Sequence, residues 1–348
     1  LQFSYNKDKI VKTVVLSKGR NCMTASKKLG RWKYVVNALV VLLVLGIIYA
    51  WSIFVKPLEN EFHWTRDQTS VIFTISLCFY CIGAICSGFI SSRIGSRLTM
   101  IISAGLILAG FIMCTFVSSL ILFYIFYGVF CGFGVGMCYN AIISTTNAWF
   151  PDKRGTVSGI MLMGFGLSGV IFSNVISALL EKYNWRTAFI VIGIIAAAIA
   201  VLGSILAKKP SPDIELPSPK GGNFATAARD FKTGEMLRTQ GFWMYTMYIM
   251  FAGAACLAIV GHAAMIANET GINAGLSEAT ATSLATFAVS AFSLCNGAGR
   301  LLTGIFYDKI GRRRTMLTVS VISIVGIASI TLAYIFYLPY LFIVGAAV

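Results

Sequence analysis

The sequence predicts an all-α membrane protein built as two related helical bundles, and three observations support this fold class. Of the 348 residues, 57% are hydrophobic and only 12% are charged, with a mean hydropathy of +0.80. This composition is too apolar to cover a water-exposed surface. Long charge-free segments recur along the chain, and one short glycine- and arginine-rich pattern occurs twice, which indicates an internal duplication.

Eight apolar segments are long enough for a helix to cross a bilayer. A spanning helix needs about 20 apolar residues, because no lipid group can satisfy a bare backbone N–H or C=O. All eight are free of charged side chains except the seventh, which contains Arg300. The segments are residues 34–55, 68–92, 98–151, 155–180, 187–207, 239–268, 279–307 and 315–348.

Two turn signals refine this division. Residues 98–151 are too long for one helix, and the pair Ser118 and Ser119 predicts a turn that splits them in two. Pro339 likewise predicts the turn that follows the third span of the second half. The chain should therefore contain nine complete spans and the start of a tenth.

The basic residues predict how these spans are oriented. Most of the 28 Lys and Arg residues lie in alternate loops, whereas the intervening loops carry only Lys56, Arg66, Lys182 and Arg186. This asymmetry follows the positive-inside rule, so the net charge of +15 indicates membrane topology and not nucleic-acid binding. We expect a multi-pass protein of the plasma or inner membrane with a cytoplasmic N-terminus, whose partners include the lipid bilayer and no nucleic acid.

The same pattern predicts the domain organisation. Residues 1–33 form a basic cytoplasmic arm that begins with Leu and not Met, which makes Met23 a candidate start and residues 1–22 a candidate non-native segment. Residues 34–207 form a six-helix bundle, residues 208–240 a cytoplasmic linker, and residues 241–348 an incomplete second bundle. The linker is expected to be a tether, with a surface amphipathic helix over residues 224–238 as the alternative.

A ten-residue pattern follows the second span of each half. The two copies, residues 88–97 and 304–313, keep the same offset of 216 residues throughout. A parallel duplication of this kind predicts that the second half continues about 70 residues past Val348 to complete six helices. The positions of interest are Gly88, Arg93, Gly95 and Arg97 in the first copy and Gly304, Asp308, Lys309, Gly311 and Arg312 in the second.

The repeated pattern, Gly-x-x-x-Asp-[Arg/Lys]-x-Gly-Arg-Arg, resembles the signature of the major facilitator superfamily. The resemblance implies that fold, two six-helix bundles of which about nine and a half of the twelve helices are present. In the family the Asp braces the loop against neighbouring helix ends, a role that Asp308 can fill. The first copy has Ser92 at this position, which puts charge-based gating of the N-terminal half in doubt.

Two longer motifs are more discriminating. Residues 147–155, Asn-Ala-Trp-Phe-Pro-Asp-Lys-Arg-Gly, and residues 230–243 resemble the oxalate/formate antiporter family, as does Tyr49-Ala-Trp51. This resemblance implies secondary active transport of small carboxylate anions by alternating access, with anion exchange. We expect a monomer without a cofactor.

Arg300 is the strongest candidate for substrate binding. An Arg within a span costs about 2.5–3.5 kcal/mol on insertion scales, which is tolerated where the side chain faces a polar cavity or a partner. No Asp or Glu occurs in any predicted span, so a substrate carboxylate is a suitable partner for the guanidinium. The alternative is snorkelling to the inner surface. By resemblance, Arg300 aligns with the helix-8 arginine that binds the anion in oxalate transporters, whose second cationic residue, a helix-11 lysine, lies beyond this sequence.

Other candidates have both a functional and a structural interpretation. The resemblance places Tyr49, Trp51 and Tyr139 in the aromatic wall of the pocket, although each alone could serve packing. His262 could titrate near neutral pH, or simply be a hydrogen-bonded helix residue. Cys78-x-x-Cys81 is read as helix packing, because no His or carboxylate stands nearby to complete a metal site.

Three functions compete with anion exchange. Proton-coupled monocarboxylate symport needs a titratable group, for which His262 is the visible candidate. A transporter-like sensor would bind without translocating, so only flux distinguishes it. A membrane-embedded enzyme would need paired His or carboxylate residues at helical spacing, and the predicted spans contain none, so we predict that the protein is not an enzyme.

Overall fold

The computed structural model describes residues 30–211, 214, 216–217 and 233–347, and for some of these, including Tyr49 and His262, the backbone only. Its contacts divide the chain into two compact units. The first unit comprises Leu1–Phe150 and Ser168–Leu216, and the second comprises Pro151–Leu167 and Pro217–Val348. The division falls inside one long helix, whose first half belongs to the second unit. The bundle limits expected from the duplication stay a prediction.

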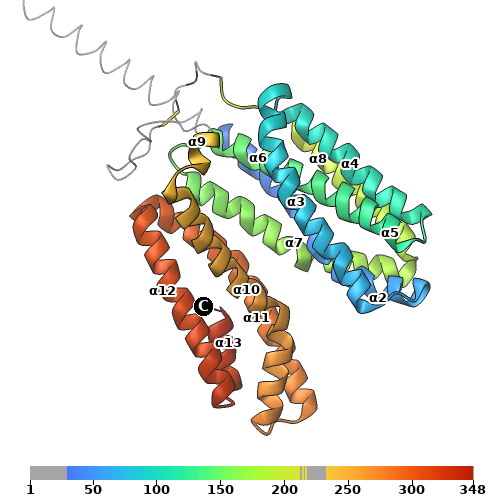
Figure 1. Ribbon diagram of the computed structural model, residues 1–348, viewed down its shortest axis with the longest axis vertical. Coiled ribbons are helices and arrows are strands. Elements are labelled where there is room, and N and C mark those ends of the chain that lie inside the picture. The colour runs from blue at the N-terminus through green and yellow to red at the C-terminus, as the bar shows by residue number, and fades with distance from the viewer. Residues whose placement is uncertain (1–29, 212–213, 215, 218–232, 348) are drawn as a thin grey trace, which may run out of the picture. The chain divides into compact units, whose positions relative to one another are not determined.

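Every element in the described part of the chain is a helix (Figure 1). The first unit begins with helical residues 30–45 and continues with η1 (Gly46–Ala50), α2 (Trp51–Phe62), α3 (Arg66–Ile94), α4 (Ser96–Phe116), α5 (Leu120–Phe123), the π-helical η2 (Tyr124–Cys131), α6 (Gly132–Ala148), the second half of α7 (Arg154–Lys182) and α8 (Trp185–Ile205). The second unit contains the first half of α7, α9 (Thr233–Leu237), α10 (Gln240–Asn273), α11 (Glu278–Ile310), α12 (Arg312–Ile335) and α13 (Pro339–Ala347).

The helices follow the predicted order along the chain. The turn expected at Ser118 and Ser119 lies between α4 and α5, and Pro339 is the first residue of α13, so both turn predictions are confirmed. Six helices of the described chain are long and apolar enough to cross a membrane: Gly30–Phe62, Arg66–Ile94, Ser96–Phe116, Leu120–Ala148, Trp185–Ile205 and Arg312–Ile335. The remaining long helices, α7, α10 and α11, have 29, 34 and 33 residues.

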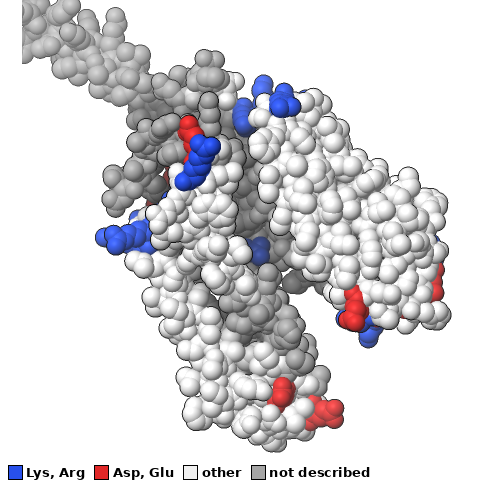
Figure 2. Space-filling model, viewed as in Figure 1, with Lys and Arg blue, Asp and Glu red and all other residues white. Residues whose placement is uncertain are grey.

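The outer surface of the helices is apolar along most of its length. On the face drawn in Figure 2, charged residues lie mainly at helix ends and the surface between them is uncharged. Large hydrophobic side chains are exposed on the helices, among them Phe89 on α3, Phe251 on α10 and Val321 on α12. Such a surface suits a hydrocarbon solvent and would be costly in water.

Glycines let the helices of the first unit pack backbone to backbone. A Cβ at Gly132 would collide with the carbonyl oxygen of Ser76, and a Cβ at Gly136 with that of Tyr80, so α6 lies directly against α3. Close approach through small residues is the usual way for helices to associate in lipid, where burial of apolar surface gives no driving force.

The second unit has its own small core. Ala267 of α10, Ala333 of α12 and Phe342 of α13 are fully buried together. Gly345 of α13 lies against the backbone of α12, where an added Cβ would be 2.9 Å from the nitrogen of Ile330. An amphipathic helix is the alternative prediction for residues 224–238 of the linker. Within this segment α9 is helical, and residues 224–232 lie outside the described part of the chain.

Candidate functional site

The two copies of the repeated motif adopt the same turn. Gly95 joins α3 to α4 with φ 86°, and Gly311 joins α11 to α12 with φ 82°. A residue with a Cβ is strained at such angles, so glycine is required at both positions. In each turn the glycine carbonyl accepts a bond of 2.9 Å from the hydroxyl of the threonine four residues later, Thr99 or Thr315.

These threonines were missed by the sequence reasoning. Thr99 and Thr315 keep the offset of 216 residues that relates the two copies, so extending the comparison by a few residues would have found them. Both side chains are buried. They close the first turn of the helix that follows each motif.

Asp308 caps the N-terminus of α7. Its Oδ1 accepts a hydrogen bond from the backbone N–H of Gly155 at 2.9 Å, and its Oδ2 accepts one from Thr156 at 2.6 Å. Because α7 begins at Arg154, these are N–H groups that have no partner within their own helix. In the first copy Ser92 instead donates to the carbonyl of Phe89 in its own helix, at 2.7 Å.

The remaining motif positions are exposed at the surface or make only van der Waals or cation–π contacts with other helices. An added Cβ at Gly88 would be 3.9 Å from the side chain of Asn140, which is ordinary van der Waals distance. Arg312 lies over the ring of Tyr245, with 5.2 Å from its Cζ to the ring centroid. Arg93, Arg97, Lys309 and Arg312 are exposed. Their role in gating stays a prediction.

Below Asp308, α7 and α11 touch through glycines. A Cβ at Gly304 would collide with the carbonyl oxygen of Gly155, and a Cβ at Gly159 would be 2.7 Å from that of Arg300. The two helices run antiparallel here, since Asp308 meets the start of α7 and Arg300 a point further along it. This close crossing brings the backbone of α7 within reach of the Arg300 side chain.

Arg300 bonds to neutral acceptors on both helices. Its Nε donates to Oδ1 of Asn296, one turn earlier on α11, at 3.2 Å. Its Nη1 donates to the carbonyl oxygen of Leu162 on α7 at 3.0 Å. The side chain therefore turns away from Asp308 and the basic loop, opposite to the direction that snorkelling to that surface requires. Within the described part of the chain no carboxylate pairs with it.

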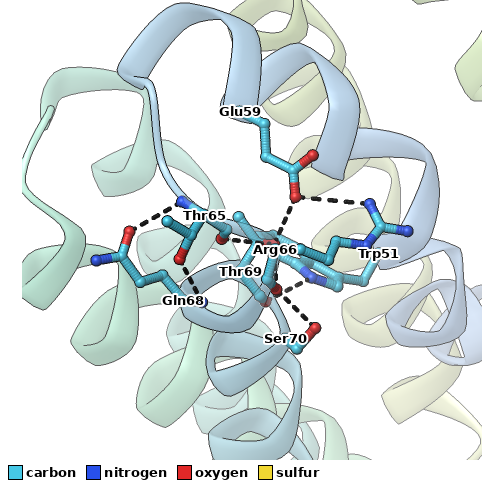
Figure 3. Close-up of polar contacts among 7 residues, drawn as sticks. All are labelled: Trp51, Glu59, Thr65, Arg66, Gln68, Thr69 and Ser70. Atoms are coloured by element: carbon cyan, nitrogen blue, oxygen red, sulfur yellow. Dashed lines mark hydrogen bonds and ion pairs between the residues drawn. The ribbon is translucent and has the colours of Figure 1, made fainter.

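The aromatic candidates that have described side chains lie in the first unit. Trp51 is only 3% exposed, its ring packs 4.4 Å from that of Tyr127, and its Nε1 donates to the carbonyl of Thr69 at 3.1 Å (Figure 3). Tyr139 is half-buried. Its ring packs edge-to-face with that of Tyr80, with 5.3 Å between the two ring centroids. This geometry gives Trp51 a packing role. The part that either ring plays in a pocket stays a prediction.

Two candidates lie outside the described side chains. Tyr49 belongs to η1 and His262 to α10, and only the backbone of each is described. Their predicted roles in the pocket wall and in proton exchange stay predictions. Cys78 and Cys81 are exposed on α3, and no group of three metal-ligating side chains occurs among the residues described.

A polar cluster that sequence reasoning did not single out fixes the connection between α2 and α3 (Figure 3). Glu59 accepts a bond from the hydroxyl of Thr69 at 2.9 Å and forms an ion pair with Arg66 at 3.5 Å. Thr65 and Gln68 form a reciprocal capping box at the start of α3. The Thr-x-x-Gln spacing before an apolar segment is readable in the sequence, whereas the contact with Glu59 needs the fold.

The sequence is similar to those of known membrane transporters. The chain is 29% identical over 301 residues to the oxalate:formate antiporter of Oxalobacter formigenes, which covers 86% of this chain and 68% of that protein. It is 26% identical over 185 residues to monocarboxylate transporter 12 of Mus musculus, covering 52% of this chain and 38% of that protein.

The fold is similar to that of a solved structure. The proton:xylose symporter XylE, bound to 6-bromo-6-deoxy-D-glucose, matches with a TM-score of 0.54 and 15% identity over 90% of this chain and 79% of that one. At this identity the likeness concerns the fold alone. Residues 36–348 match the family model of the Major Facilitator Superfamily. The prediction of an all-α, multi-pass membrane transporter that is not an enzyme is thereby confirmed, and the chain belongs to the Major Facilitator Superfamily.

Proposed function

We propose that the protein is a secondary transporter of small carboxylate anions that works by alternating access, with Arg300 at its anion site. The observation that carries this proposal is the hydrogen bonding of Arg300 between α11 and α7. Its guanidinium is held by an amide oxygen and a backbone carbonyl, and both acceptors are neutral. The positive charge itself is left for a partner that the described residues do not supply.

A carboxylate suits this partner on chemical grounds. A guanidinium does not lose its proton at any physiological pH, so the site stays cationic. Two parallel N–H donors match the two oxygens of a carboxylate, and such charge-assisted pairs are about twice as strong as neutral hydrogen bonds. The similarity to an oxalate:formate antiporter and to a monocarboxylate transporter supports the same class of substrate.

Anion exchange follows from the same charge. An empty carrier would have to carry an uncompensated cation through the low-dielectric part of the membrane, which is costly. A carrier loaded with a monoanion would be neutral at this position. We therefore propose one-for-one exchange by a monomer in the plasma or inner membrane, with its N-terminus and central linker in the cytoplasm.

Proton-coupled monocarboxylate symport is the second candidate. The similarity to a monocarboxylate transporter favours it, although that match covers only 38% of the relative. His262 on α10 would be the titrating group in this mechanism. Uptake driven by an inward pH gradient into anion-free liposomes, lost in His262→Gln, would favour symport over exchange.

The test of exchange uses the full-length protein in liposomes. Labelled oxalate and lactate uptake is measured with and without internal anion, in wild type, Arg300→Gln and Arg313→Gln. Arg313 is the matched control, because it loses the same charge at an exposed position in the first turn of α12. We expect uptake that requires internal anion, is lost in Arg300→Gln and persists in Arg313→Gln. Uptake that is equal in all three proteins would refute a role for Arg300 as the anion site.

A further inference from the structure

The wall of α7 beside Arg300 is bare backbone at Gly166. A Cβ at this position would be 3.2 Å from Nη1 of Arg300, 3.4 Å from its Cζ and 3.8 Å from its Nε. The guanidinium of Arg300 thus lies against the space that a side chain at position 166 would occupy. Gly166, Leu162 and Arg300 all belong to the second unit, so this contact lies within one compact part of the chain.

Gly166 also uncovers the acceptor that Arg300 uses. A helical side chain leans toward the N-terminus of its helix and covers the turn that precedes it. The turn preceding Gly166 presents the carbonyl of Leu162, four residues earlier, to which Nη1 donates at 3.0 Å. With a larger residue at position 166, the added Cβ would crowd the guanidinium nitrogen that makes this bond.

The two bonds orient the guanidinium. Anchoring Nε to Asn296 and Nη1 to Leu162 fixes both the position and the plane of a rigid, planar group. A guanidinium has five N–H donors, and these bonds use two of them. One N–H of Nη1 and both of Nη2 remain for a ligand, and two adjacent N–H donors of a guanidinium can bind both oxygens of a carboxylate.

We propose that Gly166 is a positioning residue for anion binding: by leaving the Leu162 carbonyl open, it holds the Arg300 guanidinium with its Nη1 and Nη2 donors directed at the substrate carboxylate. Asn296 is the second anchor. This inference rests on the proposed function, because it assigns Gly166 and Asn296 to the site that Arg300 forms.

Another glycine in the same helix pair shows why Gly166 differs from ordinary packing. Gly297 of α11 faces α7 and is buried, yet a Cβ there would be 3.5 Å from Leu167 and 3.9 Å from Met163. These are normal van der Waals distances, so alanine fits at position 297 without displacing anything. The same methyl group at position 166 would be 3.2 Å from Nη1, closer than nearly all Cβ contacts, so the guanidinium must shift by a few tenths of an ångström.

The decisive comparison is between Gly166→Ala and Gly297→Ala in the full-length transporter. Initial-rate uptake of labelled oxalate and lactate gives KM and kcat, and the thermal midpoint of the ligand-free protein reports on packing. We expect Gly166→Ala to raise KM about tenfold, equal to about 1.4 kcal/mol, because it displaces the group that binds the anion. We expect Gly297→Ala to leave KM unchanged, and both variants to keep the wild-type thermal midpoint. Asn296→Ala, which removes the other anchor without crowding the helix pair, should raise KM in the same direction.

A lysine background separates positioning from packing. Lysine has no Nη groups where the new methyl would lie, so Gly166→Ala should cost nothing further in kcat/KM when combined with Arg300→Lys. Equal losses from Gly166→Ala in both backgrounds, or equal KM values for Gly166→Ala and Gly297→Ala, would overturn the inference while the proposed function stands. If the wild-type protein takes up neither anion, the proposed function fails and the inference fails with it.

Discussion

Asp308 and Arg300 lie eight residues apart on α11, and both bind the backbone of α7. The carboxylate accepts from two N–H groups at the helix start, and the guanidinium donates to a carbonyl further along. Each charge meets backbone groups of the opposite polarity, so neither needs a charged side chain as its partner. For Asp308 both oxygens are used in this way, whereas Arg300 keeps donors for a ligand.

Replacing Asp308 with Asn should loosen the start of α7. Asparagine offers one oxygen where the carboxylate offers two, and it loses the favourable interaction of a negative charge with the helix dipole. We expect a loss of about 1 kcal/mol in the free energy of unfolding, typical of a lost helix cap, seen as a lower thermal midpoint of the purified protein. Glu269→Gln, an equal charge change at an exposed site on α10, is the control. Equal midpoints for Asp308→Asn and wild type would show that the cap does not contribute to stability.

At the scale of elements, glycines decide which helices lie against each other. Along η2 and α6 the sequence places Gly128, Gly132 and Gly136 four residues apart, and all three lie against α3. The pattern alone predicts a close approach to some helix. Only the folded chain identifies α3 as that helix and shows that the contact reaches backbone carbonyls. The same holds for Gly155 and Gly304, which join α7 to α11.

Gly132→Ala should therefore be destabilising although alanine favours helices. Its methyl group would collide with the carbonyl oxygen of Ser76, and backbone cannot turn aside as a flexible side chain can. We expect a loss of about 1–3 kcal/mol, the usual cost of overpacking a tight interface, measured as a lower thermal midpoint. Gly105→Ala is the matched control, since nothing lies within 4 Å of the added methyl group on α4. A wild-type midpoint for Gly132→Ala would mean that α3 and α6 can separate at no cost.

At the scale of the whole molecule, the distribution of Lys and Arg carries the expected orientation. The loops after α3 and α11, the loop before α7 and the central linker are basic, and the intervening loops are not. A fluorescent protein fused at residue 217 in the linker should fold and fluoresce on the cytoplasmic side. Alkaline phosphatase fused at Gly275, between α10 and α11, should be active outside. Alkaline phosphatase activity at residue 217 and fluorescence at Gly275 would contradict the predicted topology and would show that the motif loops lie outside the cell.

The sequence by itself determined the fold class, because a chain this apolar, divided into segments of spanning length, has few other ways to satisfy its backbone than as membrane helices. It also determined the duplication, since the two copies of the motif keep one offset of 216 residues. The structure adds that Gly95 and Gly311 share a conformation that requires glycine. It selected Arg300, because a charge in a span is rare and costly. None of this identified the partners of these residues.

Only the tertiary structure decided what surrounds Arg300 and Trp51. Hydrogen-bond partners such as Leu162, 138 residues away along the chain, depend on which helices cross and at what height, and local sequence carries no such information. Gly166 looks like any glycine of an apolar helix until the guanidinium is found beside it. Trp51 is predicted as a pocket residue, and the structure adds that its indole N–H is bonded to the carbonyl of Thr69 in the core of the first unit. Helical periodicity places side chains around a helix, and packing between helices then gives each one its environment.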